Sequence, residues 1–238
     1  MSRLDDVIRF YELLDELASR LGCPRRLADC TGNSGWPTKG VYFFFEPGEG
    51  RSTSGSGPRV VRVGTHALTP TSKTLLWQRL NAHRGFVRGR SAGGGNHRGS
   101  VFRLHLGAAL LARAGQTHQT WGIGASAPPQ VRKAEHPVEC LVSRYLRSMP
   151  FLWLEVSSGV DDGRLLRHRI ESNIIGVLSN ARAPGGNIAI DPPSDSWLGR
   201  YSANMHVRSS GLWNVRHVDG GYDPTALDEL ARLVRESG

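Results

Sequence analysis

The sequence KGVYFFFE, residues 39–46, places five apolar or aromatic side chains in a row. Side chains alternate between the two faces of a strand, so alternate residues from Val41 to Phe45 would face one side of a sheet and Tyr42 and Phe44 the other. A strand that is apolar on both faces is typical of the interior of a sheet. We therefore expect a central strand here.

Two further segments have strand patterns. RVVRVG, residues 59–64, follows a segment rich in Gly, Ser and Pro, residues 47–58, that is typical of a flexible hairpin loop. FLWLEVS, residues 151–157, alternates leucine and valine with larger side chains and predicts a third strand. Arg62 lies between valines of the second strand. A charge in that position indicates that the strand borders a polar cleft.

Helices are expected before, between and after these strands. The apolar spacing from Leu4 to Leu21 predicts an amphipathic helix at the N-terminus. Ser72 could cap a second helix that ends near Gly85, with Arg79 and His83 four residues apart on one face. We expect two more helices, one in the sequence RLLRHRIESNIIGVLSN, residues 164–180, and one at residues 224–235.

Glu171 lies on the apolar stripe of the helix expected at residues 164–180, together with Ile174, Ile175 and Leu178. An unpaired ionised carboxylate in an apolar environment costs several kcal/mol, so Glu171 requires a cation. That cation could be an arginine in a salt bridge within the core or a metal ion. The helical pattern leaves both open.

Composition limits the class of protein. The chain has 238 residues, 39% of them hydrophobic, and a formal net charge of +9, which favours a polyanionic partner such as nucleic acid. Three cysteines without Cys-x-x-Cys or paired histidine spacing indicate neither disulfides nor a zinc site and favour a cytoplasmic protein. The N-terminus does not resemble a signal peptide, and we find no run of roughly 20 apolar residues that would predict a membrane span.

Residues 86–150 differ in character from their flanks and are expected to form an insertion. Its first part is basic and rich in glycine, which lets a backbone approach DNA closely. Five cations within sixteen residues are candidates for DNA contact, by phosphate pairing or by reading guanine in the major groove: Arg88, Arg90, His97, Arg98 and Arg103.

The order of these elements resembles the GIY-YIG nuclease superfamily. Gly40-Val41-Tyr42 is similar to the first family motif and Arg62-Val63-Gly64 to the second, although the family usually has tyrosine where Arg62 stands. The longer hairpin is another departure. The helix arginine, the following histidine and the metal-binding glutamate of the family match Arg79, His83 and Glu171.

The resemblance implies an α+β fold with a three-stranded, mainly antiparallel sheet flanked by helices. It divides one elaborated domain into an N-terminal helical extension (1–35), a catalytic core (36–85 and 151–190), the insertion as a recognition element (86–150) and a C-terminal extension (191–238). A family asparagine follows the glutamate, and we favour Asn187 over Asn180 for it. The insertion and the lack of a separate DNA-binding domain resemble the restriction-endonuclease branch, whose members tend to be homodimers.

The implied activity is hydrolysis of double-stranded DNA by a Mg²⁺-dependent endonuclease, with Mn²⁺ as a possible substitute. Glu171 would hold the metal, Arg79 would pair with the phosphate, and Tyr42 would orient or deprotonate water. Arg62 and His83 would favour an ionised Tyr42. Lys39 and His66 flank the motifs and could contact phosphate, although a solvated face is the simpler interpretation.

Two other functions stay open. One is a non-catalytic nucleic-acid-binding protein that keeps the fold, which would be favoured if Glu171 were locked to an arginine. The other is an RNA-binding protein, which would be favoured by exposed stacking aromatics in the insertion.

Overall fold

The centre of the protein is a four-stranded antiparallel sheet with the strand order β1-β4-β2-β3. A computed structural model describes residues 2–157, 163–181 and 189–237. The strands are β1 (Arg25–Arg26), β2 (Gly40–Gly50), β3 (Pro58–Gly64) and β4 (Pro150–Glu155). The three expected strands and the α+β class are confirmed, and the two-residue β1 adds a fourth strand that pairs with the start of β4.

Strand β2 occupies the interior of the sheet, as its apolar faces predicted. It pairs with β3 on one side, where Tyr42 lies opposite Gly64, and with β4 on the other, where Tyr42 lies opposite Trp153. The first and second motifs are therefore neighbours across one hairpin. Their proximity follows from the register of β2 and β3.

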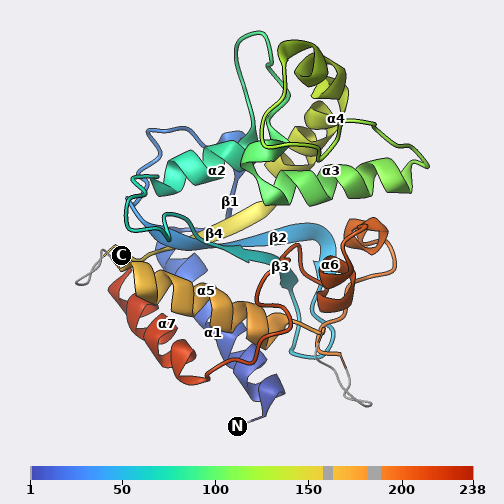
Figure 1. Ribbon diagram of the computed structural model, residues 1–238. Coiled ribbons are helices and arrows are strands. Elements are labelled where there is room, and N and C mark those ends of the chain that lie inside the picture. The colour runs from blue at the N-terminus through green and yellow to red at the C-terminus, as the bar shows by residue number, and fades with distance from the viewer. Residues whose placement is uncertain (1, 158–162, 182–188, 238) are drawn as a thin grey trace.

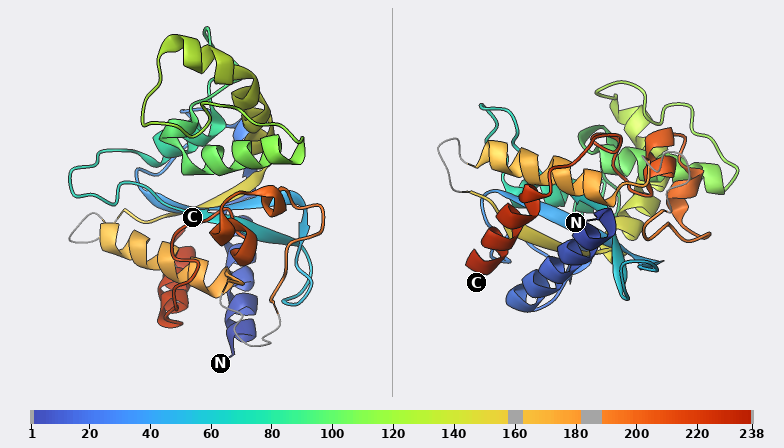
Figure 2. Two further views of the ribbon diagram at one scale, coloured as in Figure 1. Left: turned by 45° about the vertical axis from the view of Figure 1, so that its right-hand side comes forward. Right: turned by 90° about the horizontal axis from the view of Figure 1, so that it is seen from below.

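Helices cover both faces of the sheet (Figures 1 and 2). Val41, Phe43 and Phe45 belong to one buried apolar cluster and Tyr42 and Phe44 to another, so the predicted alternation is confirmed. The first cluster packs under α1 (Arg3–Leu21), α5 (Arg164–Leu178) and α7 (Thr225–Glu236), and the second under α2 (Leu76–Arg84), α3 (Val101–Arg113) and α4 (Pro129–Ser148). The shorter elements are α6 (Met205–Ser210) and the 3₁₀ turns η1 (Leu27–Asp29), η2 (His97–Gly99) and η4 (Leu198–Tyr201).

The termini of the helices follow from local chemistry. Ser2 caps α1 by accepting from the amide of Asp5, and Gly22 ends it in the left-handed conformation, as is common at helix C-termini. The expectation that Ser72 caps α2 is wrong. Ser72 Oγ instead accepts from the Thr74 amide in the preceding turn. The helix begins at Leu76 and ends at Arg84, directly before Gly85.

The hairpin between β2 and β3 is confirmed, but its loop is held in place. The Asp191 carboxylate accepts from the amides of Ser52, Thr53 and Ser54 at 2.7–3.0 Å. Burial acts to raise the pKa of the Asp191 carboxyl, but the Ser54 hydroxyl and these amides together lower it below its usual value. The loop between β2 and β3 has a composition typical of flexible segments. It is nevertheless held by a carboxylate about 140 residues further along the chain.

The insertion and the C-terminal extension both contact β2 through one carboxylate. Glu46, at 4% exposure, accepts from the indole Nε1 of Trp213 at 2.9 Å and of Trp197 at 3.1 Å, and from the hydroxyl of Tyr145 in α4. Burial raises the pKa of Glu46, while these donors lower it. Three parts of the chain are therefore joined by one polar centre within an apolar layer.

None of the helices in the described part of the chain is both long and apolar enough to cross a membrane.

Candidate active site

Tyr42 is the centre of the candidate site, and two glycines of the motifs position it. A Cβ at Gly64 would lie 2.5 Å from the Tyr42 hydroxyl and ring, and a Cβ at Gly40 would lie 2.4 Å from the Leu154 carbonyl oxygen. Both contacts are shorter than real Cβ atoms make. The glycines thus let the Tyr42 ring lie flat on β3 and let β2 approach β4.

His83 and Arg79, both on α2, contact the Tyr42 hydroxyl. His83 Nε2 lies 2.9 Å from Tyr42 Oη, and Arg79 Nε donates to the same oxygen at 3.4 Å. His83 is fully buried, and burial, assisted by nearby arginines, lowers its pKa well below the usual value. It is therefore a neutral imidazole at physiological pH.

Arg62 lies beside these groups as a buried cation. Its guanidinium lies 4.9 Å from the centre of the Phe102 ring and donates to the Trp213 carbonyl at 2.5 Å. Burial lowers the pKa of Arg62, whereas Tyr42 and Glu171 raise it. Arg62 thus brings positive charge close to both of these side chains.

Glu171 reaches the site from α5, past the end of β3. Its Oε1 accepts from the Thr65 amide at 3.1 Å, and the Thr65 hydroxyl in turn donates to the Gly40 carbonyl. Burial raises the pKa of the Glu171 carboxyl, opposed first by Arg62 and also by Arg79. Among the described residues Glu171 forms no ion pair. Its carboxylate is thus close enough to Arg62 and Arg79 to feel their charge but forms a salt bridge with neither.

The site fits a divalent cation that is held by a single carboxylate. Over residues 2–157, 163–181 and 189–237, no group of three or more His, Cys, Asp or Glu side chains gathers to form a metal cage. Mg²⁺ commonly uses one or two carboxylates and completes its octahedron with water and phosphate oxygens. Glu171 Oε2, which has no hydrogen bond to a described residue, is the donor that would hold such an ion.

Lys39 and His66 lie inside the protein next to this site, which corrects the simpler interpretation of a solvated face. Lys39 Nζ donates to the Thr74 carbonyl, and His66 Nε2 lies 3.4 Å from the Thr38 carbonyl. Burial lowers the pKa of His66 to about 4. His66 Nδ1 is buried without a partner among the described residues.

Three of the five insertion cations hold the insertion together, which corrects their expected role in DNA contact. Arg103, with 0% exposure, pairs with Glu139 and donates to the His83 carbonyl at 2.7 Å. His97 bonds the same carboxylate, and Arg98 pairs with Glu135 at 2.6 Å.

Arg88 and Arg90 are different, because both side chains are exposed and have no hydrogen bond or ion pair to a described residue. They remain candidates for DNA contact. The insertion therefore presents fewer cations to a ligand than its sequence indicates.

The expected asparagine cannot be placed. Asn187 lies outside the described residues. The Asn180 side chain accepts from the Ile190 amide at 3.0 Å and donates to the Ile190 carbonyl at 2.9 Å. That use is structural.

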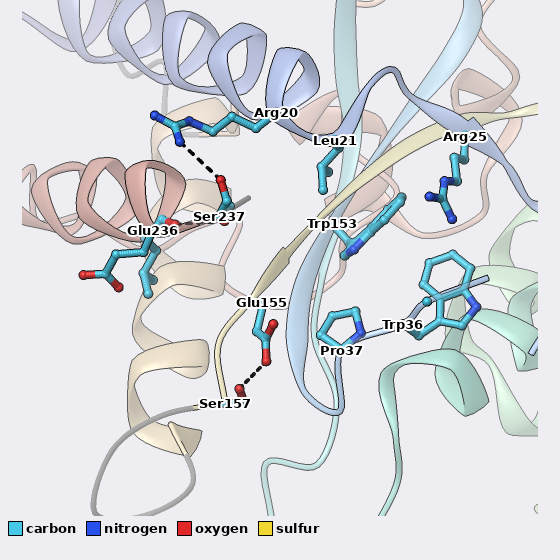
Figure 3. Close-up of a pocket in the computed structure, with 12 residues that line it drawn as sticks. Arg20, Leu21, Arg25, Trp36, Pro37, Trp153, Glu155, Ser157, Glu236 and Ser237 are labelled. Carbon is cyan, nitrogen blue, oxygen red and sulfur yellow. Dashed lines mark hydrogen bonds between the residues drawn. The ribbon is translucent and has the colours of Figure 1, made fainter. Parts of the chain in front are cut away.

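A cavity at the outer edge of β4 lies apart from the candidate site (Figure 3). Arg20, Arg25 and Trp36 line it with Glu155 and Glu236, and the guanidinium of Arg25 lies over the ring of Trp153. None of the candidate catalytic side chains is among its lining residues. Its mixed charge gives no preference for a polyanion.

Two residues that contact the candidate site, Thr65 and Ser100, were not identified from the sequence. Thr65 follows the second motif directly, so its position next to Gly64 was the available signal. Ser100 Oγ lies 2.8 Å from His83 Nδ1 and also caps α3. A serine before an apolar helical segment predicts a cap, but nothing in the sequence connects Ser100 with His83.

A phenol, an arginine, a neutral histidine and a carboxylate thus lie around one hairpin of an α+β sheet. A family model described as the GIY-YIG domain matches residues 1–238. The chain therefore belongs to the GIY-YIG domain family, and the domain indicates a nuclease, a class of hydrolases that generally depends on divalent metal ions. No curated protein and no solved structure matches the chain.

Proposed function

We propose that this chain is a Mg²⁺-dependent endonuclease that cleaves double-stranded DNA at specific sequences, in the manner of type II restriction enzymes. The observation that carries the proposal is the contact of Tyr42 Oη with both His83 and Arg79, with Glu171 close to the same arginines. Side chains from β2, α2 and α5 lie near one another here, although Tyr42 and Glu171 are more than a hundred positions apart.

Each group has a task in the hydrolysis. Tyr42 orients the attacking water and takes its proton, which requires the phenol oxygen to accept hydrogen bonds from its neighbours. Arg79 pairs with the scissile phosphate, because its guanidinium can bond two phosphate oxygens at once. Its pKa is raised, first by Tyr42, so it stays charged.

The metal ion would be bound by Glu171. When bound, such an ion polarises the phosphate and offsets the negative charge that grows on phosphorus. Mn²⁺ prefers similar oxygen ligands and should substitute. Arg62 and Lys39 add positive charge around the phosphate without contacting solvent freely.

Cleavage of supercoiled plasmid DNA tests the metal assignment. Glu171→Gln keeps the shape of the side chain and removes the charge, so we expect cleavage in Mg²⁺ to be lost while DNA binding in Ca²⁺ stays within about twofold. The matched control is Glu155→Gln, at an exposed carboxylate on β4. Wild-type cleavage by Glu171→Gln would contradict the assignment, and cleavage that persists in EDTA would contradict metal dependence.

The restriction-like character has its own tests. Discrete fragments from mixed-sequence DNA are expected if recognition is sequence-specific, and a continuous smear would contradict it. A homodimer would let two sites cut both strands of a palindrome, and sedimentation of the DNA complex measures its stoichiometry. The three free cysteines support the proposal that the protein acts in the reducing cytoplasm.

A second candidate is a non-catalytic DNA-binding protein of the same family. Arg62 favours it, because a guanidinium stands where the family usually has a second phenol. The absence of an ion pair to Glu171 among the described residues favours the nuclease. RNA binding has less support, because only Phe86 among the four aromatic residues of the insertion has an exposed side chain.

A further inference from the structure

Ser100, His83 and Tyr42 form a chain of hydrogen bonds that connects the insertion to the candidate active site. Ser100 Oγ lies 2.8 Å from His83 Nδ1, and His83 Nε2 lies 2.9 Å from Tyr42 Oη. All three side chains are essentially buried, with exposures of 1% or less. Both bonds are therefore shielded from bulk solvent, which makes an unpaired group in this chain costly.

The remaining partners of Ser100 favour one arrangement of protons in this chain. Its Oγ already accepts from the Arg103 amide at 3.2 Å, as the cap of α3. Among the described residues, His83 Nδ1 is the only acceptor that the hydroxyl hydrogen can reach. If Nδ1 carried a proton instead, the buried Ser100 hydroxyl would have no acceptor, which buried hydroxyl groups rarely tolerate.

We infer that Ser100 is a positioning residue for the nuclease reaction: it donates to His83 Nδ1 and holds His83 in the tautomer that carries its proton on Nε2. His83 then donates to Tyr42 Oη, as Arg79 does from the other side. Two donors on Tyr42 Oη would stabilise the negative charge that develops there as the water loses its proton. The catalytic part of this inference rests on the function proposed above, whereas the tautomer itself does not.

Nuclear magnetic resonance of ¹⁵N-histidine-labelled protein tests the tautomer without any activity. Protonated and unprotonated ring nitrogens have well-separated shifts, and His83→Gln identifies the signals of His83 among the nine histidines. Wild type and Ser100→Thr should have a proton on Nε2 only. Ser100→Ala and Ser100→Gly should show the other tautomer as well, and a wild-type proton on Nδ1 would overturn the inference.

Kinetics separate positioning from helix capping. Glycine is tolerated as a helix cap far better than alanine, so a role in capping alone would spare Ser100→Gly and impair Ser100→Ala. Positioning predicts that both lower kcat by about 10- to 100-fold with KM within about twofold, and that Ser100→Thr restores kcat. Ser2→Ala, which removes the cap of the remote helix α1, is the matched control.

The outcomes are distinguishable. Wild-type kcat in Ser100→Gly would overturn the positioning role. If the wild type cut no DNA under any condition, the proposed function would fail, while the resonance experiment would still decide the tautomer.

Discussion

His66 is kept neutral inside the protein, which makes folding stability depend on pH. Its pKa is about 4 in the folded protein and about 6.5 in an unfolded chain. The stabilisation is complete above pH 6.5 and is lost as pH falls toward 4, because the unfolded chain then gains a proton that the folded protein refuses. Between pH 7 and 5, the free energy of unfolding should fall by about 1 kcal/mol more in the wild type than in His66→Gln, after allowance for solvent screening.

Urea unfolding at both pH values measures this difference. His118→Gln is the matched control, because the side chain of His118 is only partly buried, in the segment between α3 and α4. Equal losses in the wild type and in His66→Gln would contradict the assignment of His66.

At the scale of single residues, the grouping of side chains at the site could be predicted from the sequence. The burial of each side chain could not. Tyr42, Arg79 and His83 could be grouped because strand and helix periodicity gives direction to each side chain. Arg103 could not be assigned to the interior, because its partner Glu139 lies 36 positions away on another helix. Two basic residues with the same local sequence character can thus have opposite environments.

At the scale of the element, the insertion contains both buried cations that hold ion pairs and exposed cations. Substitutions of the two kinds should differ in their effect on stability. Arg103→Met leaves Glu139 buried with less compensating charge and should lower the free energy of unfolding by about 3–5 kcal/mol. Arg90→Ala should change it by less than about 0.5 kcal/mol, because Arg90 is exposed. Urea unfolding of both variants checks these values.

Affinity for DNA, in contrast to stability, should depend on the exposed Arg90. Arg90→Ala is expected to weaken binding and to reduce the salt dependence by about one counterion, measured by fluorescence anisotropy at several salt concentrations. Unchanged affinity in Arg90→Ala would move phosphate contact away from this loop.

The long helices outside the insertion were predictable, whereas α3 and the first part of the 20-residue α4 within it were not. Alternation over seven residues identified β4, and helical spacing identified α1 and α5. Strand β1 has only two residues, so it has no period from which it could be recognised. The start of α2 was misplaced because Ser72 is a good cap in sequence but forms a turn instead.

At the scale of the whole molecule, Glu46 joins three segments that the sequence separates. Glu46→Ala would leave the Tyr145 hydroxyl and two indole N–H groups buried without an acceptor. We expect the free energy of unfolding to fall by about 3 kcal/mol or more. Glu46→Gln, which keeps one acceptor oxygen, should lose less, and urea unfolding measures both; equal stability of Glu46→Ala and the wild type would contradict this role.

The shortness of β1 also affects how the protein behaves at high concentration. The Val156 amide donates to the Lys39 carbonyl across β2, so the amides of Trp153 and Glu155 point outward, beyond the end of β1. Unpaired strand edges can template association with other chains, and charged side chains discourage it. Exposed Glu155 therefore favours solubility at this edge, and Arg25 adds a second charge further along it, over the ring of Trp153 (Figure 3). In Glu155→Val, light scattering should rise with protein concentration, whereas constant scattering would show that this edge does not limit solubility.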